Sequence, residues 1–584
     1  MRRVLILAMA LVLSLGVRAE FVHPDVAARY AQSVLGMKQA PVQQGSAQRA
    51  ASRDAQSAPQ YYVFNNPEGG WVIIAADDRV NPVIGYSDEG AFIQDNMPEN
   101  LKQWMDGVAA TIDAVRRDGD GVKSRPEWAA THRSAPDARK VELKTALWDQ
   151  APPFNSLCPI VTGENVRSVT GCVATSMAII MRYNRWPARG NGVIGGYTTT
   201  TAQTYIAAYS IDDHEYIWDY MPMNNSVGAG WSAEQKYQVA QLMHDCGVAV
   251  KMDYTSEASS AQSSDMIKAL QNFMSYSESS ALISRASYNL DEWYSIMKRE
   301  IDAGRVVYYA GEGESSAHAF VCDGYDTDGS KLHINWGWGG NSNGFYTLDL
   351  TIPDYDLSFS EYQEAIIGIA PDTAVVELDD VASLIFHEHE GHYGISPVAP
   401  VDMVSGSEIK FLVGWVSNYS TRDLNAEFRV RLEDKDGKVR QDGWNLSLKI
   451  PGLDGYMYNE YTAVGRLMVN PNLTDRFRLY MKDDAGKWVP VRGNHDILPD
   501  VDGVMCGVTQ DPLIIVPDDC AAGQEIELTL TMGFQPLKTV LWSVNGDLLN
   551  DNKVVLKPGD NVIRAQVEYL DQSTGYICRT LTVE

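Results

Sequence analysis

The chain has 584 residues, with 48 Lys and Arg against 76 Asp and Glu, and its formal net charge is −28 at pH 7. This balance argues against nucleic acid and anionic membrane surfaces as partners, because both carry the same sign of charge. Hydrophobic residues make up 45% of the chain, enough for packed cores, and the length predicts about three or four domains.

The first 19 residues have the pattern of a secretory signal peptide. Arg2 and Arg3 precede an apolar run of 14 residues, and Val17-Arg18-Ala19 has the small-residue pattern of a cleavage site. The apolar run is short for a membrane-spanning helix, and no second long run follows. We therefore expect a secreted protein with no membrane insertion after signal cleavage.

The region up to about residue 140 predicts a small sheet, a helix and a linker. The stretch "YYVFNNPEGGWVIIA" holds two apolar runs around a turn, which predicts a hairpin. Residues 99–117 have apolar side chains at helical spacing. A polar stretch at about 117–140 lacks periodicity, which indicates an exposed linker open to proteases.

An apolar helical pattern starts directly after Gly171, in "TGCVATSMAIIM". Apolar residues recur at helical spacing from Val173 to Met181, and Pro187 stops the pattern. Cys172 is therefore predicted in the first turn, where backbone N–H groups and the positive end of the helix dipole favour thiolate over thiol. A lone cysteine is more often an inert buried residue, so a catalytic thiol needs a neighbouring base.

A predicted β-meander over residues 315–350 offers that base. Its strands are separated by turns in "DTDGS" and "GGNSNG". His318 opens the first strand, and Asn335 and Trp336 belong to the second. An amide can orient an imidazolium, and an indole can keep water away from that contact. Simple pairing puts Asn335 about three residues from direct opposition to His318, so their contact needs twist or a bulge.

The spacing of these residues is papain-like. His318 lies 146 residues after Cys172, within the interval of about 130–150 residues typical of papain-like cysteine peptidases. Gln150 lies 22 residues before Cys172. Its amide could donate to the oxyanion of a tetrahedral intermediate, beside the backbone N–H of Cys172.

Four stretches resemble the streptopain family of secreted bacterial cysteine peptidases, in family order. They are "WDQAPPFN", "TGCVATSMAIIMRYNRWP", "AHAFVCDGYD" and "HINWGWGGNSNGFYTL". The leading "GGWVIIAADDRVNPVIGYSDEGAF" is similar to the family's inhibitory propeptide. The resemblance covers roughly residues 20–371. It implies an α+β, papain-like peptidase domain that is made as a zymogen with an N-terminal α+β propeptide.

The resemblance also implies a role for each matching residue. Cys172 would be the nucleophile and His318 the general base and acid. Gln150 would serve the oxyanion hole, and Asn335 and Trp336 would support the histidine.

A serine-rich loop, "YTSEASSAQSS", resembles the loop that lines the family's substrate site. The resemblance implies that Ser260 and Ala317 line this site. The family usually has glycine where Ala317 stands, and the loop lacks the family's usual glycines, which leaves the subsite shape open. A preference for a hydrophobic residue two positions before the scissile bond would be inherited with an intact pocket.

Beyond residue 371 the texture of the sequence changes. Short alternating runs with Asp-Gly, Pro-Gly and Asn-Gly turns predict all-β sandwich modules, with a break near 508–512.

The resemblance implies a maturation cut within about 120–142. The predicted segments are a signal peptide at 1–19, an inhibitory propeptide at 20–135, a papain-like peptidase domain at 136–371, a β-sandwich at 372–508 and an Ig-like β-sandwich at 509–584.

Metal and cofactor signals are weak. "FHEHEGHY" crowds histidines, but no register gives His-Glu-x-x-His, so only an adventitious or structural metal would fit His387 and His389. "DTDGS" and "DKDGK" lack the glutamate that ends a calcium loop. We predict no metal and no cofactor. The seven cysteines are an odd number, so at least one thiol is unpaired within the chain.

Together these patterns predict a bacterial cysteine endopeptidase, extracellular, at the cell surface or periplasmic. Its partners would be protein or peptide substrates and its own propeptide as an intramolecular inhibitor. Two alternatives stay open. One is a papain-like acyl-transfer enzyme such as a transglutaminase or a cell-wall amidase. The other is a binding protein whose β modules function while the peptidase part is vestigial. The physiological substrate, the activating protease, the role of residues 372–584, the thiol pairing and the oligomeric state are not predicted.

Overall fold

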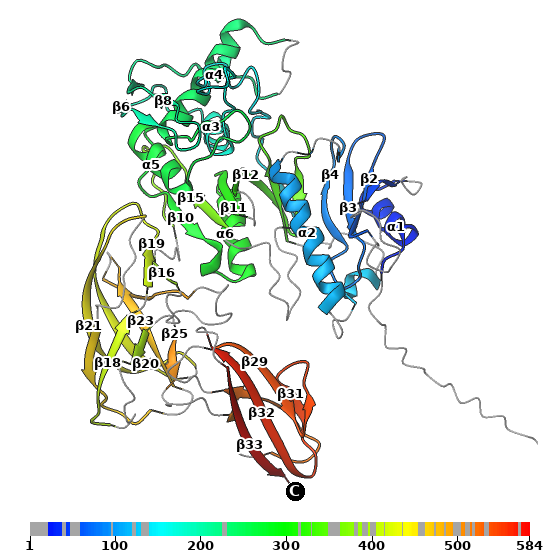
Figure 1. The fold of residues 1–584 in the computed structure, drawn as a ribbon, viewed down its shortest axis with the longest axis vertical. Coiled ribbons are helices and arrows are strands. Elements are labelled where there is room, and N and C mark those ends of the chain that lie inside the picture. The colour runs from blue at the N-terminus through cyan, green and yellow to red at the C-terminus, as the bar shows by residue number, and fades with distance from the viewer. Residues whose placement is uncertain are drawn as a thin grey trace, which may run out of the picture. The chain divides into compact units, whose positions relative to one another are not determined.

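The structure is a computed structural model, drawn in Figure 1. It describes residues 21–37, 43–46, 59–94, 97, 99–118, 124–129, 139–224, 230–312, 317–328, 330–347, 363–378, 384–387, 395–397, 405–413, 415–434, 436–453, 462–471, 475–483, 486–493, 504–507, 514–516, 520–530, 537–569 and 574–583. The predicted signal peptide and most of "FHEHEGHY" lie outside these residues. Within them, no helix is long and apolar enough to cross a membrane.

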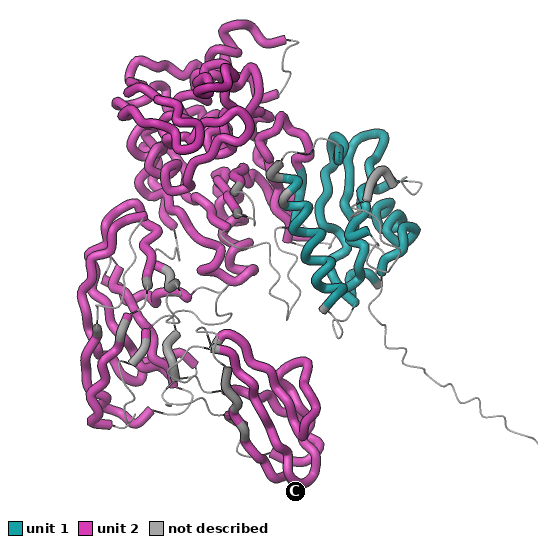
Figure 2. The backbone as a smooth tube through the Cα atoms, in the orientation of Figure 1, with its two compact units in different colours: residues 1–139, 344–359 teal, residues 140–343, 360–584 magenta. Residues whose placement is uncertain are grey.

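The chain divides into two compact units, coloured separately in Figure 2. One holds residues 1–139 and 344–359, and the other holds residues 140–343 and 360–584. The first boundary thus falls inside the linker predicted from the sequence. Residues 344–359 belong to the same unit as residues 1–139, although in the sequence they follow the strands predicted to carry His318 and Asn335.

The first unit is an antiparallel sheet in the order β1-β2-β3-β4-β14, with two longer helices. The predicted hairpin is β2–β3, in the register Tyr61↔Ala75 to Asn65↔Trp71. The predicted helix is α2. The elements are α1 (Pro24–Val34), β1 (Gln43–Ser46), β2 (Tyr61–Asn65), β3 (Trp71–Ala75), β4 (Val83–Ser87), α2 (Glu99–Asp118), η2 (Pro126–Ala129) and β14 (Gly344–Tyr346).

Both faces of this sheet are covered. Val72 and Ile74 pack in one core with Ala27 and Tyr30 of α1. Side chains alternate along a strand, so Trp71 lies on the opposite face. There the Tyr346 ring lies 5.5 Å from the Trp71 ring and 4.7 Å from the Trp104 ring of α2, measured between centroids. β14, the third strand of the predicted meander, therefore contributes to the core of the leading unit.

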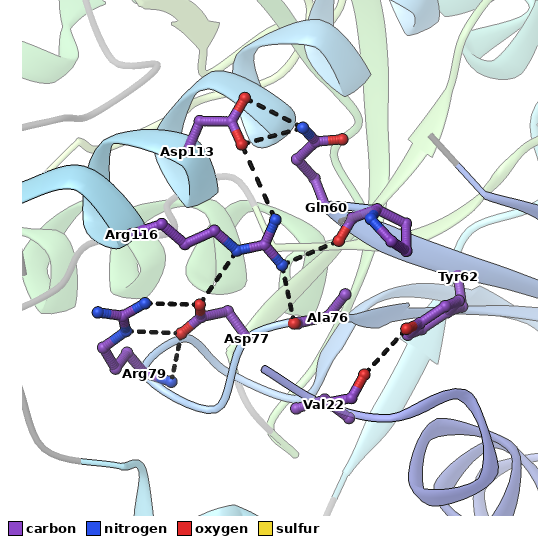
Figure 3. A network of polar contacts seen from close by, with 9 residues as sticks. Val22, Gln60, Tyr62, Ala76, Asp77, Arg79, Asp113 and Arg116 are labelled. Atoms are coloured by element: carbon purple, nitrogen blue, oxygen red, sulfur yellow. Dashed lines mark hydrogen bonds and ion pairs between the residues drawn. The ribbon is translucent and has the colours of Figure 1, made fainter. Parts of the chain in front are cut away.

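A buried carboxylate ties α2 to this sheet (Figure 3). Asp77 is 1% exposed, and it accepts two 2.7 Å hydrogen bonds from the Arg79 guanidinium and one of 3.2 Å from Arg116 Nε. Arg116 also donates at 2.9 Å to the carbonyls of Pro59 and Ala76. A buried carboxylate is stable only when paired in this way, so the network fixes the end of α2 on the sheet.

The peptidase-like part of the second unit combines helices with a sheet in the order β13-β12-β11-β15-β10, and β5 pairs with the far end of β12. One large core joins the helices Cys172–Asn184, Ala233–Ala249 and Ser263–Phe273 to this sheet. The elements are β5 (Lys140–Glu142), α3 (Cys172–Asn184), β6 (Val193–Ile194), β7 (Tyr197–Thr198), β8 (Tyr205–Ile206), β9 (Tyr209–Ser210), η3 (Trp218–Tyr220), α4 (Ala233–Ala249), α5 (Ser263–Phe273), β10 (Ala281–Ser284), η4 (Arg285–Ser287), α6 (Leu290–Asp302), β11 (Val307–Glu312), β12 (Ala317–Asp326), β13 (Lys331–Asn335) and β15 (Glu364–Ile367).

The regular elements described after residue 371 are all strands, in two groups with separate hydrophobic cores. In the first group, β17-β18-β22 and β21-β20-β23-β24 both contribute to one core, as in a sandwich. Its strands are β16 (Leu384–His387), β17 (Ile395–Pro397), β18 (Glu408–Val413), β19 (Trp415–Asn418), β20 (Leu424–Glu433), β21 (Val439–Ile450), β22 (Thr462–Arg466), β23 (Arg476–Lys482), β24 (Trp488–Pro490) and β25 (Val504–Gly507).

The second group is built on the sheet β30-β29-β32-β33. Its strands are β26 (Ile514–Ile515), β27 (Glu525–Glu527), β28 (Thr529–Leu530), β29 (Leu537–Val544), β30 (Asp547–Leu548), β31 (Lys553–Val555), β32 (Gly559–Tyr569) and β33 (Thr574–Val583). The α+β class and the strand-rich C-terminal part that the sequence predicts are confirmed. The domain limits drawn from the sequence remain predictions.

Candidate active site

Cys172 is the first residue of α3, as the sequence predicts. The helix starts there because Gly171 has a φ of +86°, a conformation that side chains disfavour. A Cβ atom on Gly171 would also lie 2.9 Å from the carbonyl oxygen of Ser259. Glycine is therefore required where the chain turns into the helix, and this turn presents the half-buried thiol.

Opposing effects act on the ionisation of Cys172. Burial raises the pKa of the thiol, and the backbone N–H groups of Ala319, Val173 and Cys172 itself lower it. Burial is the larger effect, so in this structure the neutral thiol is favoured at pH 7. The sequence does not predict this effect of burial on the sulfur. The N–H groups at the helix start act in the expected direction but do not outweigh burial.

The Ala319 contact brings the thiol to the strand that carries His318. Ala319 lies on β12 and directly follows His318, which is half-buried and pairs with Gly311 of β11. Ala319 and Val321 also pack in the same core as Val173 of α3. The start of α3 thus packs against β12, the strand that carries His318, although 146 residues separate Cys172 from His318 in the sequence.

Asn335 lies where the hairpin register predicts, opposite Val321 and three residues beyond His318. It is fully buried, and its Nδ2 donates to Thr145 Oγ1 at 2.9 Å and to the Ala146 carbonyl at 3.0 Å. Its Oδ1 accepts from the Gly337 N–H at 3.1 Å. Among the described residues, these contacts hold the amide in place, and none of them is with His318.

Trp336 follows Asn335 and is also buried. Its ring packs against Phe320 of β12 with centroids 5.0 Å apart. Its backbone N–H donates to Asn343 Oδ1 at 3.1 Å. The indole therefore packs against β12 from the position directly after Asn335, and its shielding role stays a prediction.

Gln150 is buried, and its backbone contacts the residues just before Cys172. Its carbonyl oxygen accepts a 3.3 Å hydrogen bond from Thr170, two residues before Cys172. The carboxylate of Asp149 accepts the Gln150 N–H at 2.6 Å. The backbone around Gln150 is thereby held beside the start of α3.

The serine-rich loop packs beside the same helix start. Ser259 Oγ donates to the Val169 carbonyl at 2.9 Å, and its own carbonyl faces Gly171. The neighbouring Ser260 is exposed and pairs through its backbone with Asp253. Ala317 opens β12 and pairs with Glu312 in register. The Ala317 side chain lies outside the described structure.

A buried polar cluster around Asn335 was not predicted from the sequence. Thr145 donates to Asp323 Oδ2, and Asp323 Oδ1 lies 2.5 Å from His333 Nδ1. Asp323 sits at a register shift between Cys322 and Gly324. The glycine at position 324 could have indicated this irregularity in the sequence. Glycine is needed there because a Cβ atom would lie 2.5 Å from the backbone oxygen of Val141. Nothing in the sequence marks Thr145.

Within the part of the chain that the structure describes, no three His, Cys, Asp or Glu side chains cluster so as to hold a metal ion. The described thiols Cys158, Cys172, Cys246 and Cys322 form no disulfide. Of these four thiols, Cys172 alone is not fully buried.

A thiol at a helix start beside a histidine-bearing strand defines the class of papain-like cysteine peptidases. Comparison with known proteins identifies the family. The model of the peptidase C10 family matches residues 148–346, and that of the Spi protease inhibitor matches residues 19–112. Streptopain of Streptococcus pyogenes is 31% identical over 345 residues, which cover 54% of this chain and 82% of streptopain. The chain therefore belongs to the peptidase C10 family of streptopain.

Two further known proteins are similar to parts of this chain. The thiol protease/hemagglutinin PrtT of Porphyromonas gingivalis is 37% identical over 326 residues, which cover 53% of this chain and 37% of that protein. The chain thus matches little more than a third of that relative's length. A solved structure of a prointerpain A fragment from Prevotella intermedia is 28% identical, and the match covers 56% of this chain and 99% of that fragment with a TM-score of 0.44.

Proposed function

We propose that this chain is a secreted cysteine endopeptidase, made as a zymogen, in which Cys172 and His318 carry out the reaction. The observation that supports this most directly is the contact between the Cys172 sulfur and the backbone N–H of Ala319, the neighbour of His318. Hydrophobic burial alone would not require a thiol at this position, whereas nucleophilic catalysis requires one beside a base.

The proposed reaction is acyl transfer to Cys172. The thiolate attacks the peptide carbonyl carbon, and the resulting oxyanion accepts hydrogen bonds from the Cys172 N–H and the Gln150 amide. His318 in its imidazolium form protonates the leaving amine as the C–N bond breaks, which leaves a thioester. His318 then takes a proton from water, the hydroxide attacks the thioester, and the thiolate leaves.

Asn335 and Trp336 are proposed to support His318. The Nδ2 protons of Asn335 are already used by Thr145 and Ala146, so its Oδ1 is the atom that can accept from an imidazolium N–H. Trp336 would keep water from this contact. Ser260 and Ala317 are proposed to line the substrate site, with a preference for a hydrophobic residue two positions before the scissile bond.

The leading unit is proposed to act as an intramolecular inhibitor of the mature enzyme. The match of residues 19–112 to a protease inhibitor supports this role. The proposed segments have the limits predicted from the sequence. They are a signal peptide at 1–19, a propeptide at 20–135, a peptidase domain at 136–371 and β modules at 372–508 and 509–584. The bacterial sources of the relatives and the leader pattern of residues 1–19 support export from a bacterial cell.

Casein digestion by the full chain and by Cys172→Ala tests this proposal. The wild type should shorten casein, and Cys172→Ala should lose roughly 10³-fold or more of that activity. A papain-like transferase would leave casein at its original length. Equal digestion by both proteins would remove Cys172 from the mechanism, and no digestion by a correctly processed wild type would favour a binding protein.

A further inference from the structure

Residues 140–150, here called the crossing segment, are hydrogen-bonded to β12, to Asn335 of β13 and to the residues just before α3. Lys140–Glu142 pair with the end of β12, and the Leu143 N–H donates to the Asp323 carbonyl at 2.7 Å. Trp148 accepts a 2.8 Å hydrogen bond from Gly339 in the loop after β13. Gln150 then receives the Thr170 N–H beside α3. The segment therefore runs from β12 past β13 to the helix of the thiol.

Thr145 lies at the middle of this segment, and its hydroxyl is used twice. It accepts from Asn335 Nδ2 at 2.9 Å and donates its proton to Asp323 Oδ2. A hydroxyl has one proton, so the carboxylate fixes its direction and leaves a lone pair aimed at Asn335. Thr145, Asp323 and Asn335 are all buried, where water cannot substitute for a missing partner.

His333 is the first residue in this series of contacting side chains. Its Nδ1 lies 2.5 Å from Asp323 Oδ1. Burial opposes the protonated imidazole, but the Asp323 carboxylate outweighs it and raises the pKa of His333. Asp323 thus contacts His333 through one carboxylate oxygen and Thr145 through the other. The order of contacts is His333, Asp323, Thr145 and Asn335.

We propose that Thr145, held by Asp323, is a positioning residue that orients the Asn335 amide for the cysteine-peptidase reaction. The inference rests on the proposed function, because it assigns Thr145 a role through Asn335 and not through contact with substrate. With both Nδ2 protons directed to Thr145 and Ala146, the amide cannot flip, so Oδ1 keeps its orientation. A hydroxyl at 145 is therefore needed for rate and not for substrate binding.

Two single substitutions, Thr145→Val and Thr145→Ser, test this role. Each variant is assayed after its leading unit has been removed. Valine has the shape of threonine without the hydroxyl, so kcat should fall roughly 10- to 100-fold at unchanged KM, since small misplacements of catalytic groups cost about that much. Serine restores the hydroxyl and should restore kcat. Thr199→Val is the matched control, because Thr199 is buried and its hydroxyl accepts the Thr204 N–H away from these contacts.

The pH dependence of Cys172 alkylation separates positioning from general loss of structure. If Asn335 orients His318, Thr145→Val should shift the alkylation profile toward that of an ordinary thiol, while Thr199→Val and Thr145→Ser leave it unchanged. The inference is overturned if Thr145→Val keeps the wild-type kcat and profile, or if serine fails to rescue a folded protein. If the proposed function itself is wrong, the Cys172→Ala variant will keep the activity of the wild type.

Discussion

The backbone N–H of Ala319, the residue directly after His318, acts on the sulfur of Cys172 and lowers the pKa of the thiol. This contact joins the start of α3 to β12 across 146 residues of sequence. It places a thiol and an imidazole-bearing strand together in one core, which is the arrangement that thiol-dependent acyl transfer needs.

Alkylation of Cys172 in the unprocessed chain should be slow at neutral pH. Burial raises the pKa of this thiol above its usual value, so the thiolate fraction at pH 7 is small and grows only in alkaline solution. Iodoacetamide labelling followed by peptide mass mapping from pH 6 to pH 10 measures this. Fast labelling that is complete at pH 6 would contradict the burial argument.

Replacing Gly171 should damage both folding and activity. Gly171→Ala forces a side chain into a positive φ and puts its Cβ 2.9 Å from the Ser259 carbonyl, which should cost roughly 1–3 kcal/mol. Thermal unfolding and casein digestion report the two effects. Gly195→Ala is the control, since no atom lies within 4 Å of a Cβ there. Equal behaviour of the two variants would show that Gly171 is not required.

A buried carboxylate in the helical part should make stability depend on pH. Asp245 accepts from Tyr209 and Tyr216 at 2.8 Å, and it lies 2.9 Å from His214 Nδ1. Burial opposes its charge, but hydrogen bonds from His214 and His244 outweigh it and hold the pKa of Asp245 below its usual value. The hydrogen bond to Asp245 raises the pKa of His214.

The sign of this dependence follows from the two shifts. Stability from Asp245 is present above pH about 4 and is lost as the pH falls through its lowered pKa. Stability from His214 is complete below pH about 6.5 and is lost as the pH rises through its raised pKa. The Tm difference between wild type and Asp245→Asn should therefore be largest at about pH 4–6.5 and shrink above. Asp219→Asn, at an exposed ion pair with Arg185, should change little at any pH.

The leading unit should depend on Asp77. Asp77→Ala leaves Arg79 and Arg116 without their buried partner, which should cost roughly 3–5 kcal/mol in that unit. Limited trypsin digestion of the full chain should then remove the leading unit faster than in wild type. Asp25→Ala, whose carboxylate is exposed, should leave the digestion rate unchanged. Equal rates for Asp77→Ala and wild type would show that the network does not stabilise the unit.

The mature N-terminus should lie upstream of Lys140. Lys140–Glu142 are hydrogen-bonded to β12, so cleavage within them would remove contacts from the crossing segment. This narrows the interval of about 120–142 expected from the sequence. Intact-mass measurement of the processed protein locates the cut. An active mature form that begins beyond Thr145 would contradict both this prediction and the role of Thr145.

Local patterns predicted much of the site. Apolar spacing after Gly171 marked the start of α3 at Cys172, and the hairpin turn fixed Asn335 three residues from opposition to His318, as the Val321↔Asn335 pair shows. Contacts that depend on tertiary packing could not be predicted. The Thr145–Asp323 pair joins residues far apart in sequence, and neither periodicity nor spacing marks it.

The same limit explains two further features that the sequence does not predict. The ionisation of Cys172 depends on how deeply the thiol is buried, and a helix start in the sequence does not report burial. The third strand of the meander, β14, pairs with β4 of the leading unit, because Tyr346 fits between Trp71 and Trp104. A strand's own sequence specifies its alternation and not its partner.

The most direct measurement is the mass of the processed protein after treatment with an epoxide inhibitor of thiol peptidases, followed by peptide mapping and casein digestion. The account predicts one inhibitor per chain, on the peptide that contains Cys172, with casein digestion falling in proportion to the adduct and no adduct on His318→Ala at the same dose. Full casein digestion by a protein completely modified at Cys172 would contradict it.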